Sequence, residues 1–101
     1  MNVSFDGLHK AFESRIRLGI MSVLAVNDAL DFNTLKEFLD ATDGNLATHI
    51  KKLEQEGFIQ SKKSFIENKP NTRYMITKNG KQAFDNHLKV LETIINSQKQ
   101  S

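Results

Sequence analysis

The sequence predicts an α+β fold that is mainly helical and carries one small β-hairpin. Apolar residues recur at helical spacing in several stretches, and two of these flank a tight turn at 41–44. Strand-forming residues on either side of the turn-forming segment 68–71 predict the hairpin. A long amphipathic stretch, residues 78–96, then predicts a final helix.

The composition suits a single domain over residues 1–101. Hydrophobic residues make up 39% of the chain, which supports one small core with little surplus. The absence of cysteine excludes disulfides, thiolate metal sites and thiol nucleophiles. No apolar run approaches the ~18 residues that span a bilayer, and the N-terminus lacks the pattern of a signal peptide. We therefore expect a cytoplasmic protein with no membrane partner.

The N-terminal part predicts three short helices and one short strand. Ser14 and Asn33 are placed to cap the second and third helices, because their side chains can accept a hydrogen bond from a first-turn N–H group. The strand is too short to stand alone and is expected to pair at the edge of the hairpin. In order, these elements are expected at residues 8–12, 15–26, 30–32 and 34–40.

A second helix follows the tight turn directly. Thr42 is its expected N-cap, and Gly57 is placed to end it. The helix over 42–56 should bury one face, formed by Leu46, Ile50 and Leu53. Thr77 is the expected cap of the last helix, which follows the hairpin over 60–76.

The last helix carries an apolar stripe at 4-3-4 spacing, which is typical of a seam between two helices. A domain of this size cannot cover such a stripe fully, so we expect a second copy of the chain to cover it. The expected dimer interface consists of Phe84, Leu88, Leu91 and Ile95, together with Leu8 and Phe12.

Positive charge is concentrated between residues 51 and 81. This stretch has eight Lys and Arg against three acidic residues, a net charge of +5, whereas the rest of the chain carries −3. A polyanion such as DNA would explain this asymmetry. An ordinary solvated surface remains the alternative on charge alone.

The order and spacing of four motifs resemble the winged helix-turn-helix regulators of the MarR/ArsR type, in particular the compact bacterial and archaeal ones. The motifs are RLGIM at 17–21, TDGNL at 42–46, HIKKLEQEGFI at 49–59 and KPNTRYMITKNG at 69–80. The resemblance covers residues 8–95. It implies a recognition helix at 42–56, a wing at 60–76 and a dimerisation helix at 78–96. One difference is that wings in this class are often rich in arginine, whereas this tip has only Lys69 and Arg73.

The resemblance implies a homodimeric, sequence-specific transcriptional regulator that binds a pseudo-palindromic operator in double-stranded DNA. Asn45 and Thr48 would contact base edges, and Gly44 would let the backbone approach a phosphate. Lysine and arginine side chains would fix the register through phosphates, although a solvated helix face and edge-strand protection are the alternatives. The basic candidates are Lys51, Lys52, Lys62, Lys69 and Arg73.

Other activities have weaker support. The pair Asp85 and His87 resembles half of a metal site on the last helix of some ArsR-type sensors, but the second half is missing, so we expect no metal or cofactor. His49 is expected to pack locally, and His9 has no predicted partner. No phosphate-binding loop or catalytic triad spacing indicates an enzyme. The competing function is a winged-helix module that binds other proteins without DNA. No effector is implied, although an unknown apolar small molecule between the helices is compatible with the sequence.

Overall fold

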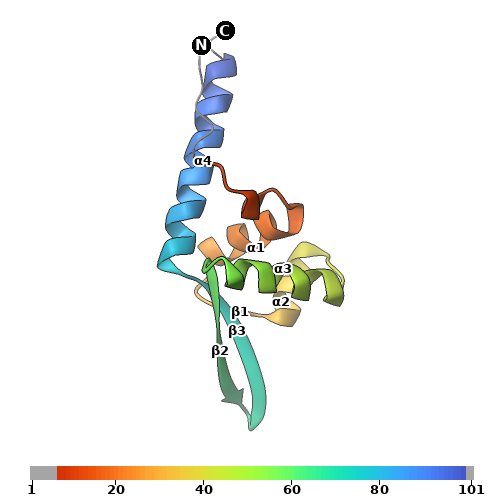
Figure 1. Ribbon diagram of the computed structural model, residues 1–101. Coiled ribbons are helices and arrows are strands. Elements are labelled where there is room, and N and C mark those ends of the chain that lie inside the picture. The colour runs from red at the N-terminus through yellow and green to blue at the C-terminus, as the bar shows by residue number, and fades with distance from the viewer. Residues whose placement is uncertain (1–6, 100–101) are drawn as a thin grey trace.

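The computed structural model describes residues 7–99 and confirms the α+β fold class (Figure 1). A helical body lies in the middle, and the hairpin and the last helix project from it in opposite directions. None of the helices in this range is long and apolar enough to cross a membrane. The elements are a 3₁₀ helix η1 (Lys10–Phe12), α1 (Arg15–Ala25), β1 (Leu30–Asp31), α2 (Phe32–Leu39), α3 (Asp43–Gln55), β2 (Ile59–Ile66), β3 (Lys69–Ile76) and α4 (Lys78–Lys99).

Side-chain caps begin the helices at the expected places, with one exception. The hydroxyl groups of Ser14, Thr42 and Thr77 accept N–H hydrogen bonds at the starts of α1, α3 and α4. The prediction that Asn33 caps α2 is wrong. Asp31 does so by accepting from the Thr34 N–H at 2.8 Å. Since Asp31 is also the last residue of β1, the chain passes from strand to helix without an intervening loop.

The sheet has three antiparallel strands in the order β1-β3-β2, so the predicted third strand is confirmed. The predicted turn at 68–71 is wrong, because the two residues between the strands are Glu67 and Asn68. Their φ angles of 52° and 64° are those required by a type I′ turn, which matches the twist of a hairpin. Pro70 lies within β3 instead. Its restriction of Lys69 to extended backbone is satisfied by a strand as well as by a turn.

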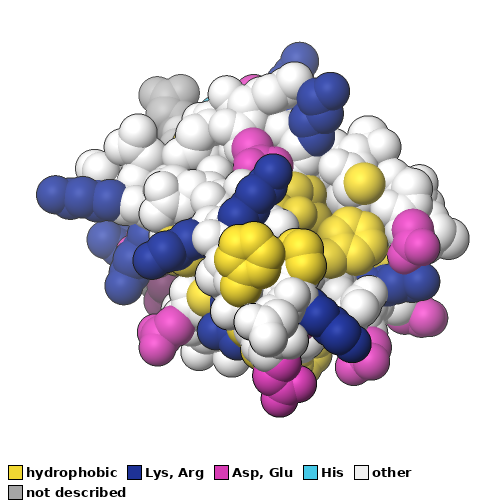
Figure 2. Space-filling model, turned by 90° about the horizontal axis from the view of Figure 1, so that it is seen from below, with side chains coloured by type: hydrophobic (Ala, Val, Ile, Leu, Met, Phe, Trp, Pro, Cys, Tyr) yellow, Lys and Arg dark blue, Asp and Glu magenta, His cyan; other side chains and the backbone are white. Residues whose placement is uncertain are grey.

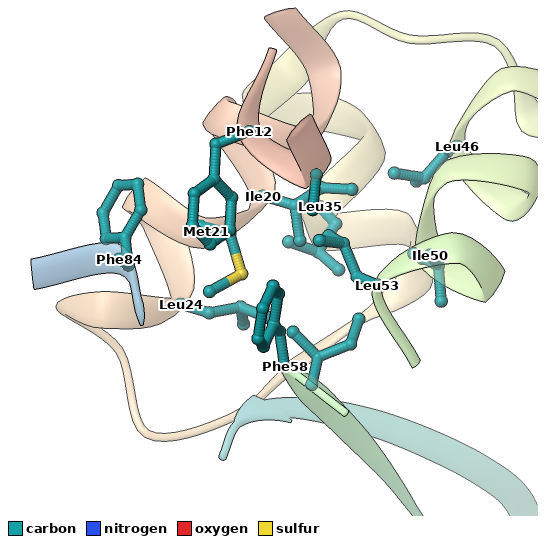
Figure 3. Close-up of a cluster of buried hydrophobic side chains, with 12 residues drawn as sticks. Phe12, Ile20, Met21, Leu24, Leu35, Leu46, Ile50, Leu53, Phe58 and Phe84 are labelled. Carbon is teal, nitrogen blue, oxygen red and sulfur yellow. The ribbon is translucent and has the colours of Figure 1, made fainter. Parts of the chain in front are cut away.

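The core joins α1, α2 and α3 to the base of the hairpin and the start of α4 (Figure 3). Phe12 and Phe84 lie inside it, at 2% and 3% exposure, with their ring centroids 5.4 Å apart. The expectation that a second chain covers these two side chains is therefore corrected, since the same chain already buries them. The largest fully buried side chains of the core are Ile20, Met21, Leu24, Leu35, Leu46 and Leu53.

A close contact at Gly80 fixes α4 against Phe58, in the short segment between α3 and β2. A Cβ atom at this position would lie 2.0 Å from the carbonyl oxygen of Phe58, so only glycine allows the approach. Thr77 binds the same segment, because its N–H donates to the Phe58 carbonyl at 3.0 Å and its hydroxyl to the Gly57 carbonyl at 2.6 Å. Gly57 itself has a φ of +78° and ends α3. Helix α3, the hairpin and α4 therefore meet at one closely packed junction.

Candidate nucleic-acid interface

Helix α3 buries one face in the core and exposes the other. The buried face is the predicted one, with Leu46, Ile50 and Leu53 at 0–3% exposure. The opposite side presents the residues predicted to contact DNA, which are all exposed: Gly44, Asn45, Thr48, Lys51 and Lys52. The exposed Gln55 also lies on this helix and was not among the predicted contacts.

The polar groups in the first turns of α3 differ in what they can offer a ligand. Within residues 7–99, the side-chain amide of Asn45 makes no hydrogen bond, so both its donors and its acceptor are free. The Thr48 hydroxyl donates to the Gly44 carbonyl at 2.9 Å and can therefore only accept from a base. No atom lies within 4 Å of a Cβ placed on Gly44, so the helix start is open to a phosphate.

An ion pair reduces the negative charge at this end of the helix. Asp43, in the first turn of α3, accepts from the Lys36 ammonium group of α2 at 2.8 Å. Both side chains are partly exposed, so the pair adds little to stability. Its main consequence is electrostatic, because the carboxylate that would repel a phosphate lies beside a fixed positive charge.

The hairpin places its basic side chains on two faces. Lys62 lies opposite Arg73 in the strand register, so these two share a face, whereas Lys63 lies opposite Thr72 on the other face. Arg73 also pairs in register with Asp31. Hydrogen bonds from Thr34 lower the pKa of Asp31, and the positive charge of Arg73 lowers it further. The charge of Arg73 is therefore partly compensated within the protein.

Two predicted phosphate contacts lie in different surroundings. Lys69 begins β3 beside the turn and is exposed. Lys52 lies at the other end of the interface, where its ammonium group is 3.4 Å from the Glu56 carboxylate one turn later. Lys69 is thus free to approach a phosphate at the hairpin tip, whereas Lys52 would first have to compete with Glu56.

A link between Arg17 and His49, which sequence reasoning did not find, fastens α3 to the N-terminal segment. Arg17 of α1 donates to the Ala11 carbonyl at 2.6 Å and to Nδ1 of His49 at 3.0 Å. Because arginine can only donate, His49 accepts and carries its proton on Nε2. Burial lowers the pKa of His49, and the neighbouring Arg17 charge lowers it further. His49 was expected to pack locally. Its hydrogen bond instead joins α3 to α1, which is distant in the sequence.

The other two histidines, His9 and His87 of α4, lie in an aromatic cluster. His87 is 7% exposed, packs its ring edge-on against Phe12 at 5.1 Å, and accepts the backbone N–H of His9 at 3.4 Å. Burial lowers the pKa of His87, with a further contribution from His9. The His9 ring packs against Phe58 at 4.9 Å. Across residues 7–99 no cluster of His, Cys, Asp or Glu could hold a metal ion, and Asp85 is exposed to solvent.

The rest of the predicted dimer face lies along α4 beyond the core. Leu88 and Ile95 are 44% and 52% exposed, and Leu91 between them is half-buried. Leu8, in the segment before η1, is also half-buried. An apolar surface thus continues along the projecting part of α4.

Comparison with known proteins agrees with this geometry. The sequence is 44% identical over 79 residues to the uncharacterized protein MJ0432 of Methanocaldococcus jannaschii, which covers 78% of this chain and 86% of that protein. The structure is similar to a transcriptional regulator homologue from Pyrococcus horikoshii OT3, with a TM-score of 0.81, 32% identity and 87% of both chains covered. A MarR-family regulator from Enterococcus faecalis V583 has the same fold, with a TM-score of 0.76, 20% identity and coverage of 90% of this chain and 84% of that one. The sequence model of the winged helix DNA-binding domain matches residues 16–95, and the chain belongs to this family.

Proposed function

We propose that this winged-helix domain is a homodimeric transcriptional regulator that reads a specific sequence in double-stranded DNA. The observation that carries the proposal is the exposed face of α3, where a free Asn45 amide and the Thr48 hydroxyl lie one turn apart at the open helix start. Asparagine can bind adenine with two hydrogen bonds in the major groove. Thr48, restricted to accepting, suits the amino group of cytosine or adenine.

The basic side chains supply affinity and register. Lys51 lies on the exposed side of α3, and Lys62 and Lys69 lie on the hairpin that flanks it. Contacts from such groups to phosphates release counterions, so binding should weaken steeply with salt. Two copies related by a two-fold axis would place their recognition helices in successive major grooves, about 34 Å apart, on a pseudo-palindromic site.

The homodimer would form through the outer part of α4. Leu88, Leu91 and Ile95 continue the helical seam beyond the point where the chain's own core ends at Phe84. Burial of this stripe against its symmetry mate would remove exposed apolar area from water. Leu8, half-buried before η1, would contribute at the edge of this interface.

Selection of bound sequences from random duplex DNA tests the proposal and returns the operator. Asn45→Ala is the sharpest variant, because it removes the free amide without touching Leu46 or Ile50. Its affinity for the selected site should fall by ~1–3 kcal/mol and its affinity for random DNA by less. Ala47→Ser, at another exposed position of α3, serves as the matched control. A wild-type protein that prefers no duplex sequence would instead support the protein-binding module.

A further inference from the structure

The hairpin projects from the helical body (Figure 1) and carries exposed apolar side chains next to its Glu67-Asn68 turn. Phe65 is 77% exposed and Ile66 is 43% exposed at the end of β2, and Pro70 is exposed at the start of β3. Seen from the side to which the hairpin points, hydrophobic side chains lie at the centre, and both basic and acidic side chains lie around them (Figure 2). Exposed strands commonly carry charged side chains that prevent association, so this tip departs from the usual pattern.

The strand register arranges these side chains on two faces. Phe65 lies directly opposite Pro70, so an aromatic ring and a pyrrolidine ring share one face of the tip. Lys63 lies two residues before Phe65 on the same face. On the other face Ile66 lies opposite Lys69. Each face therefore pairs an apolar group at the end of the hairpin with a nearby ammonium group.

The geometry points to a wedge: we propose that the hairpin tip enters the minor groove and that Phe65 inserts against a base step and bends the duplex. This inference rests on the proposed DNA-binding function. Proteins that bend DNA through the minor groove commonly insert Phe, Ile or Pro between base pairs. The turn between Ile66 and Lys69 has only two residues, so the tip is narrow enough to approach a groove about 6 Å wide.

The charge of the hairpin indicates that its binding partner is a polyanion. The hairpin over residues 59–76 has four basic side chains and one acidic side chain, Glu67, and so carries +3. Phosphates line both edges of the minor groove, and the lysines lie on both faces of the hairpin behind the tip. The arrangement also accounts for the scarcity of arginine in the hairpin. An inserted apolar side chain recognises how easily a base step deforms, and not the hydrogen-bonding groups of its bases. Pyrimidine–purine steps such as TA are the preferred target.

The experiment compares the wild-type chain with Phe65→Ala on the selected duplex. One readout is the end-to-end distance of the DNA by energy transfer, and the other is the fluorescence of 2-aminopurine placed at the flexible step. Phe65→Ala should straighten the DNA and lower the 2-aminopurine fluorescence, because the base stays stacked. It should also weaken binding by about ten-fold, as expected for loss of an aromatic contact with a base. The salt slope should not change, because no charge is removed.

Two matched variants complete the design. Phe65→Leu keeps an apolar wedge and should retain most of the bend. Phe38→Ala removes another exposed aromatic side chain, 62% exposed on α2, and should leave the bend unchanged. If wild type and Phe65→Ala bind and bend the selected site equally, the wedge is refuted while the DNA-binding function stands. If Phe65→Ala changes the sedimenting mass, the tip is a contact between copies and the wedge is also refuted. Failure of the wild type to bind any duplex would overturn both proposals.

Discussion

Replacement of Gly80 by alanine should destabilise the protein more than any other glycine-to-alanine change in a helix. The new Cβ would lie 2.0 Å from the Phe58 carbonyl oxygen and within 2.9 Å of two backbone carbons of the same residue. A contact between carbon and oxygen needs more than 3 Å, so α4 and the Phe58 segment must separate by about 1 Å. Neither side can yield through a flexible side chain, because both contacting elements are backbone.

The magnitude follows from this geometry. Overpacking at a site of this kind costs about 1–3 kcal/mol. The displacement also strains the two hydrogen bonds from Thr77 to the Gly57 and Phe58 carbonyls, each of which contributes about 1 kcal/mol. We therefore expect a loss of about 3 kcal/mol in the free energy of unfolding. For a domain of this size that lowers Tm by roughly 12–24 °C.

Urea and thermal denaturation followed by circular dichroism measure this loss. Gly44→Ala is the matched control, because it also places alanine in the first turn of a helix but meets no atom within 4 Å. Alanine is a better helix former than glycine, so Gly44→Ala should leave the free energy of unfolding unchanged or raise it by up to about 1 kcal/mol. Equal stability of the two variants would refute the argument that the Gly80 contact holds α4 in place.

Four further predictions test other parts of the structure. Lys69→Ala should weaken binding almost equally on operator and random DNA and reduce the salt slope by about one; an unchanged slope would leave Lys69 an edge-protecting residue. Leu88→Asp should give a folded monomer in sedimentation, since Leu88 is already 44% exposed in the protomer; a monomeric wild type would contradict the dimer. The free energy of unfolding should fall as pH drops below about 6.5. The pKa values of His49 and His87 are lowered in the native state, so these side chains bind protons more readily in the unfolded chain. His49→Gln should flatten this pH dependence in urea titrations. Glu67→Asn should raise Tm slightly, because asparagine tolerates the positive φ of the turn better, and should also tighten DNA binding; a looser complex would argue against phosphate near the tip.

The sequence predicted elements well where local chemistry determines them. Thr42 caps α3 and Gly57 ends it as expected, because a hydroxyl cap and a left-handed glycine act within a few residues. The two local errors arose where a motif fitted two conformations. Asp31 and Asn33 are both good caps, and strand pairing to Tyr74 and Arg73 decided in favour of Asp31. Pro70 fits a turn and an exposed strand equally well.

The candidate site could be predicted only in part, because its remaining features depend on contacts between distant segments. The exposed side of α3 follows from periodicity, so Asn45 and Thr48 could be named in advance. Nothing near Phe84 distinguishes it from Leu88 in the apolar stripe, yet only Phe84 meets Phe12 in the core. The hydrogen bond from Arg17 to His49 joins residues 32 positions apart, and no local sequence pattern predicts it.

The same contacts bear on how the proposed dimer would select its operator. The Arg17 bond holds one side of α3 to the N-terminal segment, and the Gly80 and Thr77 contacts hold the C-terminal end of α3 to α4. Helix α3, the hairpin and α4 are therefore held against one another within each protomer. In a dimer formed through α4, the separation of the two recognition helices is then set by how the Leu88 stripes pack. A change in that packing should alter the preferred half-site spacing, whereas a change at Asn45 should alter the preferred bases within each half-site.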